Sequence, residues 1–100
     1  MAEDNGPKRL MVEADSVLKL PRHIKLRHDA GRDKWLLLAP ERVFEPDETS
    51  VEVLRLCDGE TNVSAIADVL AERYQAPVDV ILKDIIEMLQ DLADKGVVKS

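Results

Sequence analysis

The chain has 100 residues, of which 45% are hydrophobic and only 3% aromatic, and its formal net charge is −6 at pH 7. A chain of this length is typical of one domain with one modest core, and it is too short to enclose a deep pocket. The scarcity of aromatic residues predicts an aliphatic core of Leu, Ile, Val and Ala. The negative charge disfavours a polyanionic partner, because each phosphate contact requires Lys or Arg.

Charge is distributed unevenly along the chain. Residues 17–45 carry seven basic and four acidic side chains, whereas residues 46–100 carry five basic and twelve acidic ones. The single cysteine, Cys57, cannot form an intramolecular disulfide and fits a reducing compartment. The opening MAEDNGPKRL lacks the apolar run of a signal peptide, and no stretch is apolar enough to span a membrane. We therefore expect a cytoplasmic protein with no membrane segment.

The first sixteen residues, MAEDNGPKRLMVEADS, are polar, contain Gly6-Pro7 and show no sustained apolar period. This composition predicts a flexible tail or linker over residues 1–16, with the folded domain over residues 17–100.

Three short strands are predicted next. The second half of VLKLPRHIKLRH (17–28) alternates apolar and basic residues, as a half-buried strand does. The turn DAGRD (29–33), in which Gly31 can take positive φ, leads to KWLLL (34–38), whose apolar run is typical of a central strand covered on both faces. ERVFE (41–45) alternates again between two prolines, which favours a short edge strand. The short connections predict an antiparallel meander.

Three helices are predicted after Pro46, where the apolar period changes from two to about 3.6 residues. The first is expected from about Asp47, its N-cap, to Asp58, with Gly59 as its stop. The second begins at Thr61 or Asn62 and ends at QAP (75–77). The third begins near Val78 and ends at Gly96. The sequence therefore predicts an α+β, winged-helix-like domain in which a three-stranded antiparallel sheet precedes three helices.

Catalytic and metal sites find little support in the sequence. His23 and His28 lie five residues apart on one strand, so they point to opposite faces and cannot share a metal with the distant Cys57. Cys57 lies in the interior stripe of a predicted helix, where thiols are usually inert, and no serine stands in a G-x-S-x-G motif. No glycine-rich phosphate loop occurs. We expect neither a catalytic residue nor a bound metal or cofactor.

The second and third predicted helices form a helix-turn-helix, which raises a second hypothesis, a winged-helix DNA-binding protein. Its recognition helix would be the third, which carries five acidic side chains against two lysines between Asp79 and Lys95. Such a helix would set carboxylates against phosphates, so its charge disfavours DNA binding.

The predicted edge strand Glu41–Glu45 allows two interpretations. In the first interpretation, the open edge is only protected against aggregation, by Pro40, Pro46 and the charged side chains between them. Trp35 and Phe44 are then core residues. Alternatively, the open edge receives a peptide as its next strand, held by main-chain hydrogen bonds and lodged against the third helix.

Around WLLLAPERV (35–43) and to both sides of it, the sequence resembles the PqqD family of pyrroloquinoline quinone biosynthesis. The resemblance covers about residues 20–98 and rests on WLLLAPERV, VLRLCDG (53–59), IADVLAERY (66–74) and LQDLADKGVV (89–98), in this order. It implies a peptide chaperone that is not an enzyme. Such a chaperone binds the PqqA-like precursor peptide and delivers it to a PqqE-like radical S-adenosylmethionine enzyme. The iron–sulfur cluster and the nucleotide belong to that enzyme and are not expected on this chain.

The resemblance also implies where the peptide binds, namely between the third strand and the third helix. On this sequence the implied residues of that site are Leu38, Glu41, Arg42, Val43, Phe44, Glu45, Val80, Ile81, Lys83, Asp84 and Glu87. Some relatives are fused behind a PqqC-like oxidase, so residues 1–16 are either a native extension or a linker from such a fusion.

Overall fold

The computed structural model describes residues 10–100 and contains the predicted three-stranded antiparallel sheet, with strand order β2-β3-β4. β2 spans Lys25–Asp29, β3 spans Lys34–Leu38 and β4 spans Val43–Phe44. Asp29 Oδ1 accepts a hydrogen bond from the Gly31 N–H at 3.1 Å and closes the turn between β2 and β3. The positive φ of this turn falls on Asp33, at 54°, and not on Gly31 as predicted.

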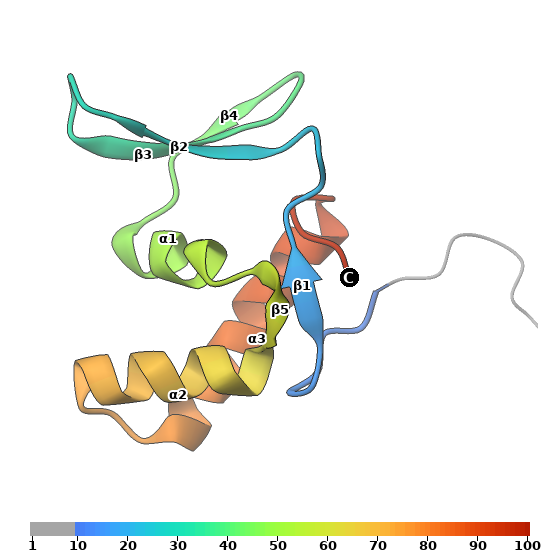
Figure 1. Ribbon diagram of the computed structural model, residues 1–100, viewed down its shortest axis with the longest axis vertical. Helices are drawn as coiled ribbons and strands as arrows, with labels where there is room; N and C mark the ends of the chain where they lie inside the picture. Colours follow the sequence, from blue (N-terminus) through green and yellow to red (C-terminus); the bar gives the residue numbers. More distant parts are fainter. Residues whose placement is uncertain (1–9) are drawn as a thin grey trace, which may run out of the picture.

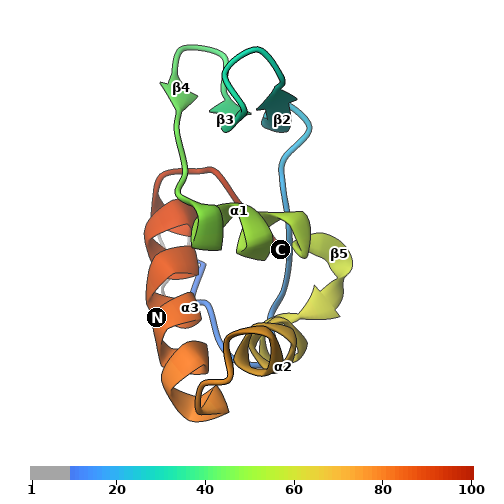
Figure 2. The same cartoon turned by 90° about the vertical axis from the view of Figure 1, so that its left-hand side faces the viewer.

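The sheet is covered on one face only, although the sequence predicted a central strand covered on both. Leu37 is 1% exposed and belongs to the core, whereas Leu36 and Leu38 are half-buried and do not pack against it. Because side chains alternate along a strand, Leu36 and Leu38 point to the opposite face. Figures 1 and 2 show the helices on the core side of the sheet and no element on the other side.

Three helices follow the sheet, as predicted. α1 spans Glu48–Arg55, α2 spans Val63–Tyr74 and α3 spans Val78–Asp94. The side chains of Asp47 and Asn62 cap α1 and α2, each accepting a backbone N–H three residues later at 2.8 Å. α3 ends before Gly96, whose φ of 79° confirms it as the predicted stop. In Figure 2, α3 runs along one side of the molecule, next to both α1 and α2.

A second, two-stranded sheet was not predicted. It pairs β1 (Val17–Lys19) with β5 (Asp58–Asn62), so the first helix is shorter than expected and Gly59 is not its stop. Asp58 Oδ1 accepts hydrogen bonds from the N–H groups of Glu60 and Thr61 at 2.9 and 2.8 Å. This side-chain turn, together with a φ of 81° at Gly59, redirects the chain into a strand.

The N-terminal boundary of the domain also differs from the prediction. Residues 1–9 of the predicted tail lie outside the described residues, but Leu10–Ser16 pack on the domain. Val12 is 6% exposed, and its N–H donates to Gln90 Oε1 at 2.9 Å. Gln90 Nε2 in turn donates to the Leu10 carbonyl at 2.8 Å. The folded part therefore begins before Val17.

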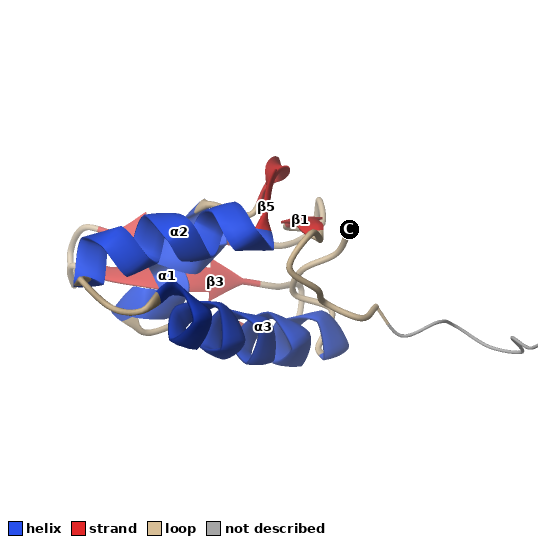
Figure 3. Cartoon of the chain, turned by 90° about the horizontal axis from the view of Figure 1, so that it is seen from below, coloured by secondary structure: helices blue, strands red, loops and turns tan. Residues whose placement is uncertain are grey.

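The core is aliphatic, as the composition predicts. Its largest fully buried side chains come from every layer of the fold, and they are Leu18, Leu37, Val53, Leu54, Val63, Ile66, Leu70, Ile85, Leu89 and Val97. Figure 3 shows α2 and α3 side by side beneath the sheet, and half of these side chains come from these two helices. Within residues 10–100 no helix is long and apolar enough to cross a membrane.

Replacing Val12 with Ala tests whether residues 10–16 belong to the domain. The change removes part of a buried side chain, so we expect the free energy of unfolding to fall by about 1–3 kcal/mol in urea titrations. Met11→Ala is the matched control, because Met11 is 57% exposed, and it should change stability by less than about 0.5 kcal/mol. Equal stabilities for the two variants would mean that this segment contributes nothing to the core.

Candidate functional site

A groove runs along α3 on the side that faces β4 and α1. It consists of two adjoining hollows of about 240 and 260 Å³, which share Met88. The hollow nearer the sheet is lined by Leu37, Phe44, Glu45, Pro46, Ser50, Leu54, Met88, Asp91 and Leu92. The second is lined by Thr49, Leu70, Tyr74, Ile81, Asp84, Ile85 and Met88. In Figure 2, β4 is the strand of the sheet that lies on the side of α3.

The floor of the groove is apolar because residues three and four apart share one face of a helix. Ile81, Ile85, Met88 and Leu92 follow this spacing along α3. Ile85 is 2% exposed, while Met88 is half-buried. The unbranched thioether of methionine adapts readily to different neighbours, which suits a surface that receives a side chain. The groove can thus hold apolar side chains of an extended segment.

β4 leaves the backbone of Val43 open to an additional strand. Ala39 and Arg42 exchange backbone hydrogen bonds, with N···O distances of 2.9 and 3.4 Å. Residues that exchange such bonds alternate with residues that do not, so Phe44 bonds to Leu37 on β3 and Val43 turns its N–H and C=O outward. The edge groups of Arg42 and Phe44, which were expected to receive a peptide as well, therefore face β3. Val43 is the residue of β4 that can accept a new strand.

The groove is acidic in the middle and basic beyond it. Glu45, Asp84 and Asp91 line its two hollows, and two of these carboxylates have cations nearby: Lys34 Nζ lies 3.5 Å from Glu45, and Lys95 Nζ lies 2.9 Å from Asp91. A third hollow of about 410 Å³ continues the groove past Phe44. It is lined by His23, Ile24, Ala39, Pro40, Glu41, Arg42, Phe44, Lys95, Gly96 and Val97. An extended ligand thus meets carboxylates first and cations toward the C-terminal end of α3.

The structure brings part of the predicted site together. Phe44, Glu45, Ile81 and Asp84 line the groove, and Glu41 and Arg42 line the third hollow, where the Arg42 guanidinium lies 5.6 Å from the Phe44 ring centre.

The other predicted residues lie outside these hollows. Val80, Lys83 and Glu87 are exposed on α3 and line none of them. Leu38 and Val43 pair with each other, and Leu38 directly follows buried Leu37 on β3. Because side chains alternate along a strand, both point to the face of the sheet that is turned away from the core. Leu38 therefore does not border the space beside Phe44, contrary to the prediction.

Sequence reasoning missed several residues that line the groove. They are Leu37, Pro46, Thr49, Ser50, Leu54, Leu70, Tyr74, Ile85, Met88, Asp91 and Leu92. The helical spacing from Ile81 indicates Met88, but the residues of α1 and α2 enter the site only through the tertiary packing of these helices against α3.

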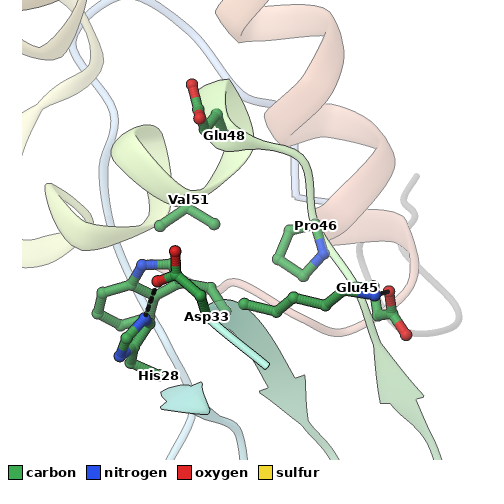
Figure 4. Close-up of a pocket in the computed structure, with 8 residues that line it drawn as sticks. His28, Asp33, Glu45, Pro46, Glu48 and Val51 are labelled. Atoms are coloured by element: carbon green, nitrogen blue, oxygen red, sulfur yellow. Dashed lines mark hydrogen bonds and ion pairs between the residues drawn. The ribbon is translucent and has the colours of Figure 1, made fainter. Parts of the chain in front are cut away.

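Trp35, the single tryptophan, lies outside the groove. Its ring lies 5.2 Å from the Arg55 guanidinium and 5.1 Å from the His28 ring. The contact with Arg55 connects the β2-β3 hairpin to α1. It borders a hollow of about 400 Å³ that also contains His28, Asp33, Lys34, Glu45, Pro46, Glu48 and Val51. Figure 4 shows His28 and Asp33 facing each other there; His28 Nε2 lies 3.2 Å from Asp33 Oδ1. Among the described residues, no Ser, Thr or Cys side chain, which such a pair could activate, lines this hollow.

Cys57 is buried, and burial, followed by the nearby Asp58 charge, raises the pKa of its thiol to about 12. The thiol is therefore neutral at physiological pH, and a neutral thiol is a poor nucleophile. Among residues 10–100 no three His, Cys, Asp or Glu side chains are grouped to hold a metal ion.

Comparison with known proteins identifies the family. The sequence model of coenzyme PQQ synthesis protein D (PqqD) matches residues 34–98. The PqqA binding protein of Bradyrhizobium diazoefficiens is 55% identical over 91 residues, which cover 91% of this chain and 88% of that protein. The chain belongs to the PqqD family. The bifunctional coenzyme PQQ synthesis protein C/D of Methylorubrum extorquens is 47% identical over 83 residues, which are 83% of this chain and 22% of that protein.

Solved structures of PqqD proteins share the fold. The solution structure of the PqqD truncation of Methylobacterium extorquens PqqCD superposes with a TM-score of 0.77 at 44% identity, covering 89% of this chain and 95% of that one. That truncation is described as a functional, stand-alone recognition element for ribosomally synthesized and post-translationally modified peptides. The crystal structure of PqqD from Xanthomonas campestris gives a TM-score of 0.52 at 34% identity, covering 95% of this chain and 93% of that one.

Asp47 holds the start of α1, which carries Ser50 and Leu54 to the groove. The backbone N–H of Ser50 donates to its carboxylate and keeps the pKa of Asp47 below the ordinary 3.8. A lowered pKa means that this stabilisation is complete above pH 3.8 and is lost as the pH falls further. We expect Asp47→Ala to lower the free energy of unfolding by about 0.5–2 kcal/mol at pH 7.

Asp47→Asn is the control for this prediction, because asparagine also caps helices but does not titrate. It should keep nearly all stability at pH 7 and lose the part of the acid dependence that Asp47 contributes. Urea titrations at pH 7 and pH 3 measure both. A loss in Asp47→Asn as large as in Asp47→Ala would contradict the assigned role of the cap.

Proposed function

We propose that this chain is a non-catalytic peptide chaperone of pyrroloquinoline quinone synthesis. It binds the PqqA-like precursor peptide and presents it to a PqqE-like radical S-adenosylmethionine enzyme. The observation that carries the proposal is the open backbone of Val43 on β4, directly beside the apolar floor of the groove. The names of the PqqA binding relatives support the choice of peptide.

The peptide binds as a fourth strand next to β4. Main-chain hydrogen bonds to Val43 set its register, and alternate side chains then point toward α3. Those side chains pack against Phe44, Ile81 and Met88. On α3, Asp84 lines the groove, and the predicted Val80, Lys83 and Glu87 are exposed on the flank beside it, where they border the bound peptide.

Charge selects among peptides more than it holds them. Asp84 favours a cationic side chain or an amino terminus, and Arg42 at the far end favours a carboxylate. Both side chains are exposed, and an exposed ion pair contributes about 0.2–1 kcal/mol. The apolar contacts and the backbone bonds therefore provide most of the affinity. The five acidic side chains between Asp79 and Lys95 also disfavour duplex DNA as the ligand, because they would lie against its phosphates.

The Val43→Pro variant tests strand addition. Proline removes the outward N–H of Val43 but none of the hydrogen bonds between β3 and β4, and edge strands tolerate it. We expect the affinity for the PqqA-like peptide to fall about tenfold, the loss of about one buried hydrogen bond, in isothermal titration calorimetry. Val43→Thr keeps the N–H and the branched shape, so it should bind like the parent. Unchanged binding by Val43→Pro, with the fold intact by circular dichroism, would exclude this mode.

The Val80→Asp variant tests the α3 side of the site. Val80 is 51% exposed and lies one helical turn before Asp84, which lines the groove. The thermal midpoint should therefore stay nearly unchanged while peptide affinity falls, because burying a carboxylate against apolar peptide side chains is costly. Val69→Asp is the matched control, since Val69 is 38% exposed but lies on α2 and not on the helix proposed to contact the peptide. Backbone amide shifts on peptide addition complete the test: changes that avoid both β4 and α3 would place the peptide elsewhere.

A further inference from the structure

The sheet has a second surface that the groove does not use. It faces away from the helices and carries Leu36, Leu38 and Val43, with Lys25 and Arg27 beside them on β2. We call these five residues the outer face. The register places them together, because Lys25 pairs with Leu38, Arg27 with Leu36, and Val43 with Leu38. Residues directly opposite on neighbouring strands share one face of the sheet.

Nothing in the described chain covers the outer face. Val43 is 62% exposed, and neither Leu36 nor Leu38 packs against the core. A hollow of about 430 Å³ lies on this side, lined by Arg27, His28, Asp29, Ala30, Leu36 and Leu38. Figures 1 and 2 show the three-stranded sheet at one end of the molecule with its outer side clear.

The cations of the outer face are free to meet a partner. Other basic side chains of this sheet have carboxylates nearby, since Arg32 lies 4.0 Å from Asp29 and Lys34 lies 3.5 Å from Glu45. Within residues 10–100, neither Lys25 nor Arg27 has an ion-pair partner. Asp29 lies at the hairpin end of the same face, but Arg32 is nearby as its ion-pair partner, so the unpaired charges beside the apolar centre are the two cations. This arrangement fits a protein surface with an apolar centre and an acidic margin.

We propose that the outer face is the docking surface for the enzyme that receives the peptide, an inference that rests on the proposed function. A peptide strand added next to β4 extends the same sheet, so every second peptide side chain joins the outer face. An enzyme seated there therefore contacts the chaperone and the peptide strand at once. The groove side stays occupied by the peptide, and the two partners do not compete.

A charge-reversal variant, Lys25→Glu with Arg27→Glu, tests the docking surface. Both side chains are exposed and neither lines the groove, so stability and peptide affinity should stay unchanged. Binding to the PqqE-like enzyme, measured by surface plasmon resonance with the peptide present, should weaken at least about tenfold. The control is Lys19→Glu with Lys99→Glu, which makes the same change of charge at the two-stranded sheet and should bind the enzyme like the parent.

The outcomes separate this inference from the proposed function. Enzyme binding that is equally weakened by both double variants, or unchanged in both, would overturn the docking surface while the chaperone role stands. Failure of the parent to bind the peptide would instead overturn the chaperone role. Analytical ultracentrifugation distinguishes a second copy of the chain: a parent dimer that only the Lys25→Glu, Arg27→Glu variant disrupts would assign the outer face to self-association and overturn the inference.

Discussion

The pleat of β3 is the constraint on which both proposed binding surfaces depend. One buried side chain, Leu37, fixes which face of the sheet meets the core, and the pairing of Leu37 with Phe44 carries that choice to β4. A slip of one residue would bury Leu36 and Leu38 and would turn the outer face inward. Because the register is fixed, Phe44 lines the groove while Val43 offers its backbone at the edge and its side chain on the outer face.

The proposed chaperone role separates recognition from chemistry. The groove offers backbone groups, an apolar floor and carboxylates, and the buried thiol of Cys57 stays neutral. A small domain without catalytic groups can speed a reaction by raising the local concentration of substrate at an enzyme. An open sheet edge suits this task, because main-chain bonding tolerates many sequences while the pockets on either side select among them.

Much of the fold could be predicted because its signals are local. Alternation identified the meander, and the side chains of Asp47 and Asn62 marked the starts of two helices. The second sheet could not be predicted in this way, because β1 and β5 are far apart in sequence and DGETN (58–62) has little strand propensity. The buried Val12 was missed for a related reason, since its segment is held by residues that are distant in sequence, among them Gln90 on α3 and Ser64 at the start of α2.

The candidate site could be predicted on the strand and only partly on the helices. The two prolines around ERVFE indicated the edge, and the family resemblance implied Ile81 and Asp84 on the third helix. The outward direction of Leu38 depends on the sheet having one covered face, which the apolar run KWLLL did not reveal. Ser50 and Leu54 enter the groove because α1 packs across α3, and no local pattern encodes that packing.

The brevity of β4 has a kinetic consequence. The strand comprises Val43–Phe44, and Pro46, which has no N–H, soon follows it. A peptide that binds there as proposed finds few backbone partners, so the lifetime of that complex would depend on how well the peptide side chains fit the groove. A poorly matched guest dissociates quickly, and even a matched one is not locked in place as it would be along a full-length edge. Rapid exchange of this kind suits a carrier that must release each substrate before it collects the next.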